Sequence, residues 1–392
     1  FNGRQILPST KIAKHTKKLK SKQNQKMIPI AKPFLDNNEI KAVSEVLKSG
    51  MIAQGPKVVE LEEKFARLCG TKCAIAVNSG TAALHTSLHV AGIKKDDEVI
   101  TTPFTFIATA NTILMQQAKP VFVDIDEDTF NMDANKIKEK ITKKTKAIVT
   151  VDLYGLLCDY NEIEKIAKKN NLIIVEDACQ AVNAEQNGRK AGNFGDIAAF
   201  SFYGTKNITC GEGGMIATNN KEYANNAKLF RQHGRSKMTS YEYSGLGYNY
   251  RATDISAAIL LEQLKKIEVI TKKRIENAEY LSRNLGKIKG IKVPDVKNSR
   301  SHVFHQYTIR VLENFKLNRD ELNEHLNKKG IGTGVYYPKP LHLLPHLKKF
   351  GYKDRDFPIA EKLSGQVISL PVHPHLAKEQ LDYIINTIKE LE

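Results

Sequence analysis

The 392-residue sequence predicts an α/β fold: a mostly parallel seven-stranded sheet flanked by helices, followed by a smaller C-terminal α+β domain. From about residue 70 to residue 218, short β-branched runs alternate with helical patterns, which is typical of parallel strands joined by helices. From about residue 291, strand-like and helical pieces are mixed. Hydrophobic residues make up 41% and charged residues 26% of the chain, which excludes wholesale disorder.

The strand predictions come from seven apolar runs, at residues 73–77, 98–101, 120–124, 147–151, 172–176, 197–202 and 214–218. Between them, helical patterns predict helices over residues 81–91, 105–117, 133–141 and 160–170. A long Lys-rich helical pattern over 254–290 predicts a connecting helix between a large domain (27–253) and a small one (291–392). Ligands bind beyond the carboxyl ends of strands in such sheets, so we expect the functional site in the segments that follow the strands.

Residues 1–26 form a basic leader with Arg4, seven lysines and no acidic residue, and so hold eight of the seventeen net positive charges. Little in the leader can be buried, so it is expected to be disordered. A nucleic-acid-binding arm is the alternative, but basic tails without a binding fold are usually only solvated. We therefore expect neither nucleic acid nor a membrane as a partner. Met27, where the folded pattern begins, is expected to be the natural start or the edge of the domain.

The five cysteines are scattered and include no CxxC pair, which predicts reduced thiols in a cytoplasmic protein. No apolar run approaches the roughly 18 residues of a membrane span. Residues 1–30 contain no apolar stretch of the kind that a secretory signal needs.

The segment NSGTAALHTSL follows the first predicted strand and opens a helix. Its free N–H groups at Gly80, Thr81 and Ala82, with the helix dipole, favour an anion site, and a plain helix cap is the alternative. In TPFTFIATANTI, Phe104 and Phe106 come just after a strand, where an aromatic ring either packs in the core or stacks on a ligand.

Two further segments carry candidate chemistry. VEDACQA places Asp177 at the end of an apolar strand, with Gln180 three residues on; a nearly buried carboxylate there needs a cationic partner. Glu176 points to the opposite side if the pleat persists, so Asp177 is one candidate of two, and a cap or salt bridge is the structural alternative. In FSFYGTKNITCGEGGMI, desolvation of Lys206 would lower its pKa and expose a nucleophilic amine, unless Lys206 is a surface lysine.

Other patterns argue against nucleotide hydrolysis, dinucleotide binding and metal binding. The sequence has no GxxxxGK[ST] and no GxGxxG motif. His85 and His89 lie in HTSLH, without the glutamate of a zinc-binding HExxH, and the histidines near the C-terminus lack an ordered set of cysteine or acidic ligands. We therefore expect no metal site.

In this order, the segments resemble the sugar aminotransferases of the DegT/DnrJ/EryC1/StrS family, which use pyridoxal phosphate in the aspartate aminotransferase fold (fold type I). The resemblance runs from about Met27 to the C-terminus. Besides the motifs above it includes IPIAKPFL, PVFVDID, RQHGR, LGYNYRATDISAAILLEQLKK, YYPKPLH and SLPVHP.

The resemblance implies a role for each candidate residue. Lys206 would carry the cofactor through a Schiff base, Asp177 would pair with the protonated pyridine nitrogen, and Gln180 would hydrogen-bond the phenolic oxygen. The phosphate would be held by Ser201 and the turn formed by Gly80, Thr81 and Ala82, and Phe106 would stack on the ring. Asn249 corresponds to a residue that reaches the phosphate from the partner subunit, which implies a homodimer with shared active sites.

The resemblance also implies a substrate class: a nucleotide-diphosphate-linked keto-sugar, with an amino acid, most often L-glutamate, as donor. The turn NITCGEGG looks more like members that aminate C4 of a 4-keto-6-deoxy sugar. Amination at C3 or of a keto-inositol is the alternative within enzymes, and a non-catalytic pyridoxal-phosphate-binding sensor is the alternative outside catalysis. Arg231, Arg235 and Arg251 are candidates for neutralising the diphosphate. A related subgroup of dehydratases replaces the lysine with histidine, and the presence of Lys206 argues against it.

Overall fold

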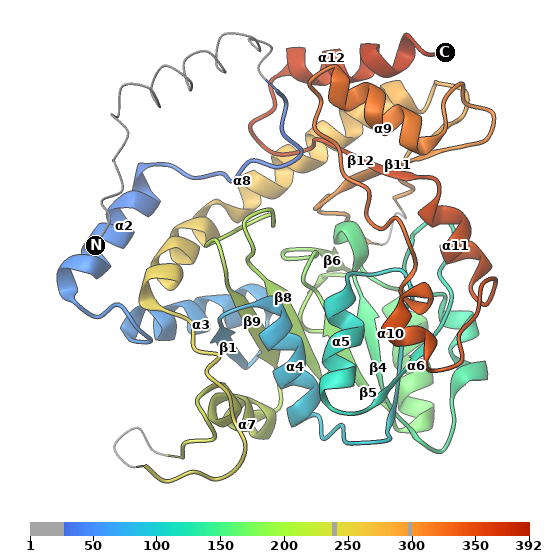
Figure 1. Cartoon of the computed structure of the whole chain (residues 1–392). Helices are drawn as coiled ribbons and strands as arrows, with labels where there is room; N and C mark the ends of the chain where they lie inside the picture. Colours follow the sequence, from blue (N-terminus) through green and yellow to red (C-terminus); the bar gives the residue numbers. More distant parts are fainter. Residues whose placement is uncertain (1–26, 237–240, 297–299) are drawn as a thin grey trace, which may run out of the picture.

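A computed structural model describes residues 27–236, 241–296 and 300–392 (Figure 1). The predicted leader, residues 1–26, lies outside the described residues. The main sheet of the described part has seven strands in the order β1-β9-β8-β5-β4-β2-β3. Their bounds are β1 Cys73–Val77, β2 Glu98–Thr101, β3 Lys119–Phe122, β4 Thr145–Val151, β5 Ile173–Asp177, β8 Ile197–Ser201 and β9 Gly214–Thr218. The predicted α/β class and all seven strands are confirmed.

Only β9 runs against its neighbours, pairing antiparallel with β1 and β8, whereas all other neighbouring strands pair in parallel. The reason is local. No helix connects β8 to β9, so the chain turns back beside the strand it has just left. That connection contains Lys206 and starts at the carboxyl end of β8. Because β4, β5 and β8 run parallel, their carboxyl ends lie at the same edge of the sheet.

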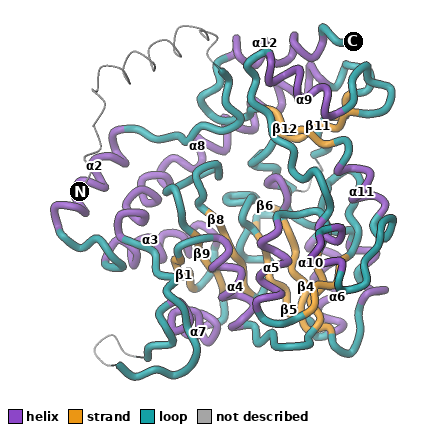
Figure 2. The backbone as a smooth tube through the Cα atoms, viewed as in Figure 1, coloured by secondary structure: helices purple, strands orange, loops and turns teal. Residues whose placement is uncertain are grey.

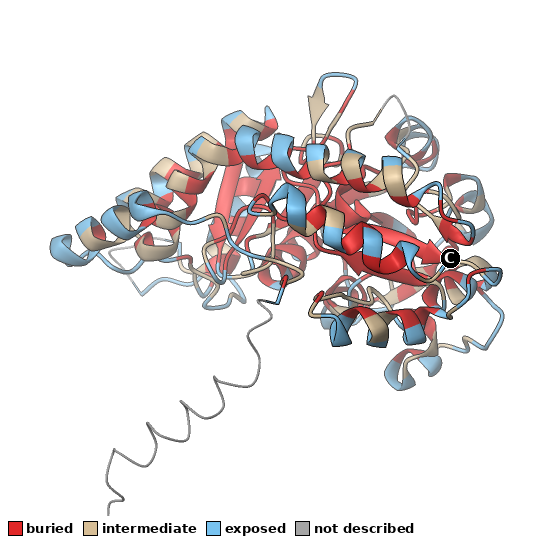
Figure 3. Cartoon of the chain, turned by 90° about the horizontal axis from the view of Figure 1, so that it is seen from above, coloured by how far each residue is buried: buried red, intermediate tan, exposed pale blue. Residues whose placement is uncertain are grey.

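Helices cover both faces of this sheet. They are α2 Asn37–Ser49, α3 Pro56–Cys69, α4 Gly80–Val90, α5 Ile107–Met115, α6 Tyr160–Asn170, α7 Lys221–Arg231 and α8 Asp254–Leu285. Alternate strand residues enter separate cores: Ile75 and Val175 pack with side chains of α4 and α7, whereas Ala76 and Ile174 pack with those of α3 and α6. Figure 3 shows the sheet strands as buried, with mixed burial on the surrounding helices. This two-sided burial explains the apolar runs that predicted the strands.

The C-terminal part forms a second, antiparallel sheet, β10-β11-β12, whose strands β11 and β12 lie apart from the main sheet in Figure 2. This part has its own hydrophobic core. Its elements are β10 Ile291–Lys292, β11 Tyr307–Val311, β12 Val367–Leu370, α9 Arg319–Lys328, α10 Pro345–Lys348, α11 Pro358–Ser364 and α12 Lys378–Lys389; a hairpin of β6 Glu185–Gln186 and β7 Arg189–Lys190 forms a third, small sheet. Helix α8 contacts α2 and α3 and also α12, so it passes from the large sheet to the second one. The division into domains at 27–253, 254–290 and 291–392 stays a prediction.

The predicted helix over 133–141 is wrong. The structure has two short 3₁₀ turns there, Ala134–Lys136 and Lys138–Lys140. Of this segment, only Ala134 and Ile137 are buried, so no apolar stripe is available to stabilise a regular α-helix. Among the described residues, no helix combines the length and apolar character that crossing a membrane requires.

Candidate active site

A cavity of about 520 Å³ opens at the carboxyl ends of β5 and β8. It is lined by the start of α4, the first part of α5 with the loop before it, the residues after β5, the β8–β9 connection, the residues before β11, and two tyrosines from the C-terminal part. Seven of the nine predicted site residues line it: Gly80, Thr81, Phe106, Asp177, Gln180, Ser201 and Lys206. Ala82 and Asn249 do not.

The N-terminus of α4 forms one wall of the cavity. Ser79 caps the helix by accepting a hydrogen bond from the Ala82 N–H at 3.1 Å, so Ala82 is buried and its N–H is not free, contrary to expectation. The N–H groups of Gly80 and Thr81 have no hydrogen-bond partner in the described chain and face the cavity at the positive end of the helix dipole. The helix cap uses the Ala82 N–H and leaves those of Gly80 and Thr81 for an anion, so the helix cap and the anion site do not exclude each other.

Gly80 also lies against Ser201, the last residue of β8. A Cβ atom at Gly80 would come within 2.7 Å of the Ser201 Cβ, so only glycine allows the helix start and the strand end to approach this closely. Their approach brings the Ser201 hydroxyl beside the free N–H groups of α4. Together the three groups are suited to binding an anion such as a phosphate.

Asp177 and Glu176 point to opposite faces of the sheet, which decides between the two candidates. Asp177, 5% exposed, lines the cavity and accepts a hydrogen bond from the Thr109 hydroxyl at 2.8 Å. Burial raises the pKa of Asp177, although hydrogen bonds from Cys179 and Thr109 and the nearby Lys206 act in the opposite direction. The surrounding groups therefore only partly offset the cost of burying the charged carboxylate, and a cationic group in the cavity would stabilise it.

Glu176 has a structural role instead. It is fully buried, and its carboxylate accepts hydrogen bonds from the N–H groups of Gly192 at 2.6 Å and Phe194 at 3.1 Å. Burial raises the pKa of Glu176 to about 7. Glu176 thus organises the turn before β8 and does not contact the cavity.

Lys206 is half-buried and reaches the cavity from the β8–β9 connection. Its ammonium forms no ion pair with a described residue. Burial lowers the pKa of Lys206, and the opposing effects of Cys179 and Asp177 are smaller. A larger fraction of the amine is therefore neutral and nucleophilic at a given pH than in an ordinary lysine.

Gln180 and Phe106 line the cavity between the large sheet and the C-terminal part. The Gln180 Nε2 donates to the Tyr337 hydroxyl at 3.4 Å. Phe104 is fully buried, so it packs in the core. Phe106 is 55% exposed at the cavity, so it is the ring that is free to stack on a ligand.

Asn249 lies outside the cavity of its own chain. It is exposed, its backbone pairs with Gln232, and its carbonyl accepts a hydrogen bond from the Asn78 side chain at 3.3 Å.

Several cavity residues were missed by the sequence predictions. Thr109 donates a hydrogen bond to Asp177. Cys179 lies between Asp177 and Gln180 in the sequence, and Glu212 lies on the β8–β9 connection. The C-terminal part contributes His305, Gln306, Tyr336 and Tyr337. His305 is buried, and desolvation together with Lys206 and Arg274 lowers its pKa well below the usual range, so its imidazole is neutral. Nothing in the local pattern around His305 indicates that it lies in a cavity with Asp177 and Lys206, which are far away in the sequence.

Arg231 is not available to a diphosphate, contrary to expectation. It is buried, and its Nη1 donates to Glu62 Oε1 at 2.5 Å and to the Ala76 carbonyl at 2.7 Å. Likewise, His85 contacts the Tyr250 hydroxyl at 3.0 Å and His89 stacks on Phe230. Within the described ranges, no cluster of three or more His, Cys, Asp or Glu side chains could hold a metal ion.

Replacing Arg231 by methionine should lower the free energy of unfolding by about 3–5 kcal/mol, because the largely buried carboxylate of Glu62 loses its cation and keeps only the Ala76 N–H as a partner. Denaturant unfolding measures the change. The double variant Glu62→Met/Arg231→Met should recover part of the loss, since neither charge is then stranded. A single variant with wild-type stability would show that this ion pair has no structural role.

The model of the DegT/DnrJ/EryC1/StrS aminotransferase family matches residues 33–389. The chain belongs to this family.

Individual family members are similar over nearly the whole length. GDP-perosamine synthase of Caulobacter vibrioides is 38% identical over 366 residues, which cover 93% of this chain and 98% of the synthase. The structure of Helicobacter pylori PseC, an aminotransferase of pseudoaminic acid biosynthesis, has a TM-score of 0.88 and 32% identity over 93% of this chain and 99% of PseC. Spr1654 of Streptococcus pneumoniae, solved in a PLP form, has a TM-score of 0.89 and 30% identity over 93% of this chain and 98% of its own.

The protein is therefore a sugar aminotransferase that depends on pyridoxal phosphate, as the resemblance implied. The donor set of the cavity fits this cofactor. Free N–H groups and a hydroxyl suit its phosphate, a buried carboxylate suits its pyridine nitrogen, and an amine of lowered pKa suits its aldehyde.

Proposed function

We propose that this enzyme moves an amino group from an amino acid, L-glutamate, to C4 of a nucleotide-diphosphate-linked 4-keto-6-deoxy sugar. The observation that carries the proposal is the cavity that joins Lys206, Asp177 and the free start of α4. The similarity to GDP-perosamine synthase and the turn NITCGEGG between Lys206 and β9 favour a nucleotide-linked sugar and its C4 position.

Each residue has a distinct task in this reaction. Bound pyridoxal phosphate would supply an electron sink and a carbonyl carbon that takes up the amino group. The N–H groups of Gly80 and Thr81 and the Ser201 hydroxyl would hold its phosphate. The Asp177 carboxylate would keep its pyridine nitrogen protonated, and Phe106 would stack on its ring.

Lys206 moves the proton. Its neutral Nζ takes a proton from the carbon that bears the amino group of the donor, and returns a proton to C4 of the sugar in the second half of the reaction. Because Lys206 lines the cavity that would receive the cofactor and the substrate, its amine is already at the site where the proton has to be moved. The lowered pKa of Lys206 supports this role, since the proton acceptor must be the neutral amine.

A homodimer is part of the proposal. Asn249 is exposed away from the cavity of its own chain, which agrees with a role in the site of a partner subunit. Large apolar side chains are exposed near α2 and α3 and in the segment before Asn249: Leu35, Ile40, Leu47, Met51, Ile52, Val59, Tyr241 and Leu246. Their burial in a second copy of the chain would remove them from water.

The proposal is tested with the purified holoenzyme, L-glutamate and a panel of nucleotide keto-sugars that carry the keto group at C3 or C4, plus a keto-inositol. We expect amination of a 4-keto-6-deoxy sugar with kcat/KM at least about 100-fold above the 3-keto sugars, a difference of roughly 2.7 kcal/mol in transition-state binding. Mass spectrometry and NMR identify the aminated carbon.

Each other outcome of the panel supports a different assignment. Preference for a 3-keto sugar or a keto-inositol would reject the C4 assignment. A holoenzyme that binds pyridoxal phosphate, yet exchanges no amino group with L-glutamate or any other amino acid, would favour the sensor.

A further inference from the structure

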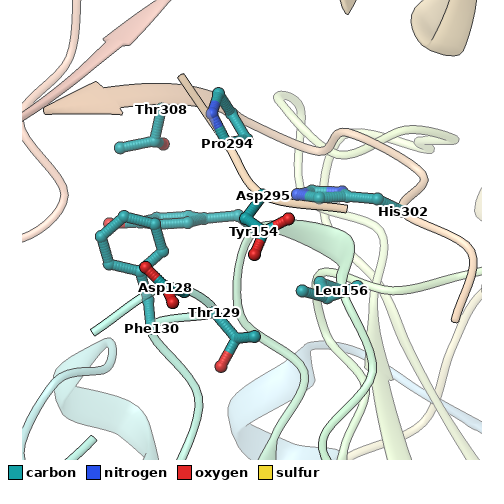
Figure 4. A pocket seen from close by; sticks show the side chains of 9 residues that line it. All are labelled: Asp128, Thr129, Phe130, Tyr154, Leu156, Pro294, Asp295, His302 and Thr308. Atoms are coloured by element: carbon teal, nitrogen blue, oxygen red, sulfur yellow. The ribbon is translucent and has the colours of Figure 1, made fainter. Parts of the chain in front are cut away.

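Tyr154 adopts an unusual backbone conformation behind the cavity. It follows β4 in a short turn with φ 59° and ψ 1°, the left-handed region that non-glycine residues rarely occupy. Its side chain is buried and packs edge-on against Phe130, as Figure 4 shows. Such a conformation persists only where the surrounding contacts require it, and residues of this kind cluster at functional sites.

The conformation aims the Tyr154 N–H at Gln180. The N–H donates to Gln180 Oε1 at 2.9 Å, and the other end of the amide, Nε2, donates to the Tyr337 hydroxyl at 3.4 Å in the cavity. An amide side chain has one acceptor end and one donor end. Because the backbone N–H occupies the acceptor end, Gln180 must present its donor end to the cavity.

Tyr154 also joins the other parts of the cavity wall. Its carbonyl accepts a hydrogen bond from the Gln306 N–H at 3.2 Å, and its hydroxyl donates to the Tyr336 carbonyl. The next residue, Gly155, accepts from the Val303 N–H at 2.9 Å. The turn after β4 therefore holds Gln180 and the two C-terminal segments of the cavity in one arrangement.

We propose that Tyr154 is a positioning residue whose left-handed backbone fixes the amide of Gln180 with its Nε2 donor toward the phenolic oxygen of the bound cofactor. The proposal depends on the proposed function in one respect: Gln180 must face the phenolic oxygen of the bound cofactor. A donor there stabilises negative charge on the oxygen, and so lowers the pH at which the bound cofactor loses its proton.

The test is a pH titration of the visible absorbance of the bound cofactor in the holoenzyme. Gln180→Leu, of similar size, should raise the midpoint by about one pH unit, because a donor to the charged form is lost. If Gln180 instead presented its oxygen, the same change would lower the midpoint. The direction of the shift therefore reports the orientation of the amide.

A matched pair tests Tyr154 itself. Tyr154→Gly and Tyr154→Ala lose the same ring and hydroxyl, but only glycine adopts the left-handed conformation without strain. We expect the glycine variant to keep the wild-type midpoint and the alanine variant to shift upward, with thermal unfolding measured for both. Tyr154→Phe keeps the backbone and the ring, and should titrate like the wild type.

A downward shift in Gln180→Leu, or equal midpoints in the glycine and alanine variants, would overturn the proposal. If the two small variants do not fold, the direction found for Gln180→Leu decides. A wild type that titrates as expected but aminates no sugar would reject the proposed substrate and leave this inference intact.

Discussion

Replacing Lys206 by alanine is expected to lower kcat for transamination by at least about 10⁴-fold and to remove the visible absorbance of the bound cofactor. Lys206 is the only lysine that lines the cavity in the described chain, and burial lowers its pKa. Both tasks proposed for its amine, holding the cofactor and moving the proton, would be lost together. Steady-state kinetics and an absorbance spectrum of the purified variant measure the two effects.

The control is Lys221→Ala, which removes an exposed lysine at the start of α7 and should change neither quantity by more than about twofold. In the wild type, cofactor uptake should quicken with rising pH, and its midpoint should lie below the ordinary lysine value of 10.5. A Lys206→Ala enzyme with wild-type kcat would remove Lys206 from catalysis.

The same variant tests the shared site. In mixed dimers of Lys206→Ala and Asn249→Ala chains, one site combines an intact Lys206 with an intact Asn249 from the partner subunit. Mixing two weakly active proteins should therefore restore part of the activity. No recovery would place the role of Asn249 within its own chain, or exclude a role in the site.

The sheet was predictable because its strands are buried on both faces. CAIAV, EVIT and GMIAT have the observed bounds of β1, β2 and β9, since apolar runs flanked by polar residues mark where such strands begin and end. The part of the site that follows those strands was predictable for the same reason. Lys206, Asp177 and Gly80 all lie within a few residues of a strand end.

The rest of the site depends on contacts that no local pattern records. His305 and Tyr337 reach the cavity from the C-terminal part, and Thr109 donates a hydrogen bond to Asp177 from the first turn of α5. Arg231 carries the charge that a diphosphate needs, yet its partner Glu62 lies 169 positions away. The left-handed conformation at Tyr154 falls on a tyrosine one residue before Gly155, so the residue type gives no sign of it.

Two adjacent carboxylates at the end of β5 show where the sequence could only pose alternatives. The pleat assigns Asp177 to the cavity and Glu176 to the turn before β8. The two side chains share a strand, are both buried and both have raised pKa values. Matched variants of this pair therefore separate catalysis from stability.

The Asp177→Asn enzyme is expected to bind pyridoxal phosphate but to lose roughly 10²- to 10³-fold in kcat. Asparagine keeps the size of the side chain and a hydrogen-bonding oxygen, but carries no charge to keep the ring nitrogen protonated. Without that positive charge, the electrons released when the proton leaves carbon are poorly stabilised. Single-turnover reaction with L-glutamate measures the loss, and the absorbance of the bound cofactor shows that the site is filled.

Glu176→Gln is the matched control. Its amide cannot accept hydrogen bonds at both ends, so one of the buried N–H groups of the turn before β8 loses its partner, at a cost of about 1–3 kcal/mol in the free energy of unfolding. The folded fraction should keep wild-type kcat. An Asp177→Asn enzyme of full activity would contradict the catalytic role of Asp177. A Glu176→Gln enzyme that is stable but inactive would contradict the structural role of Glu176.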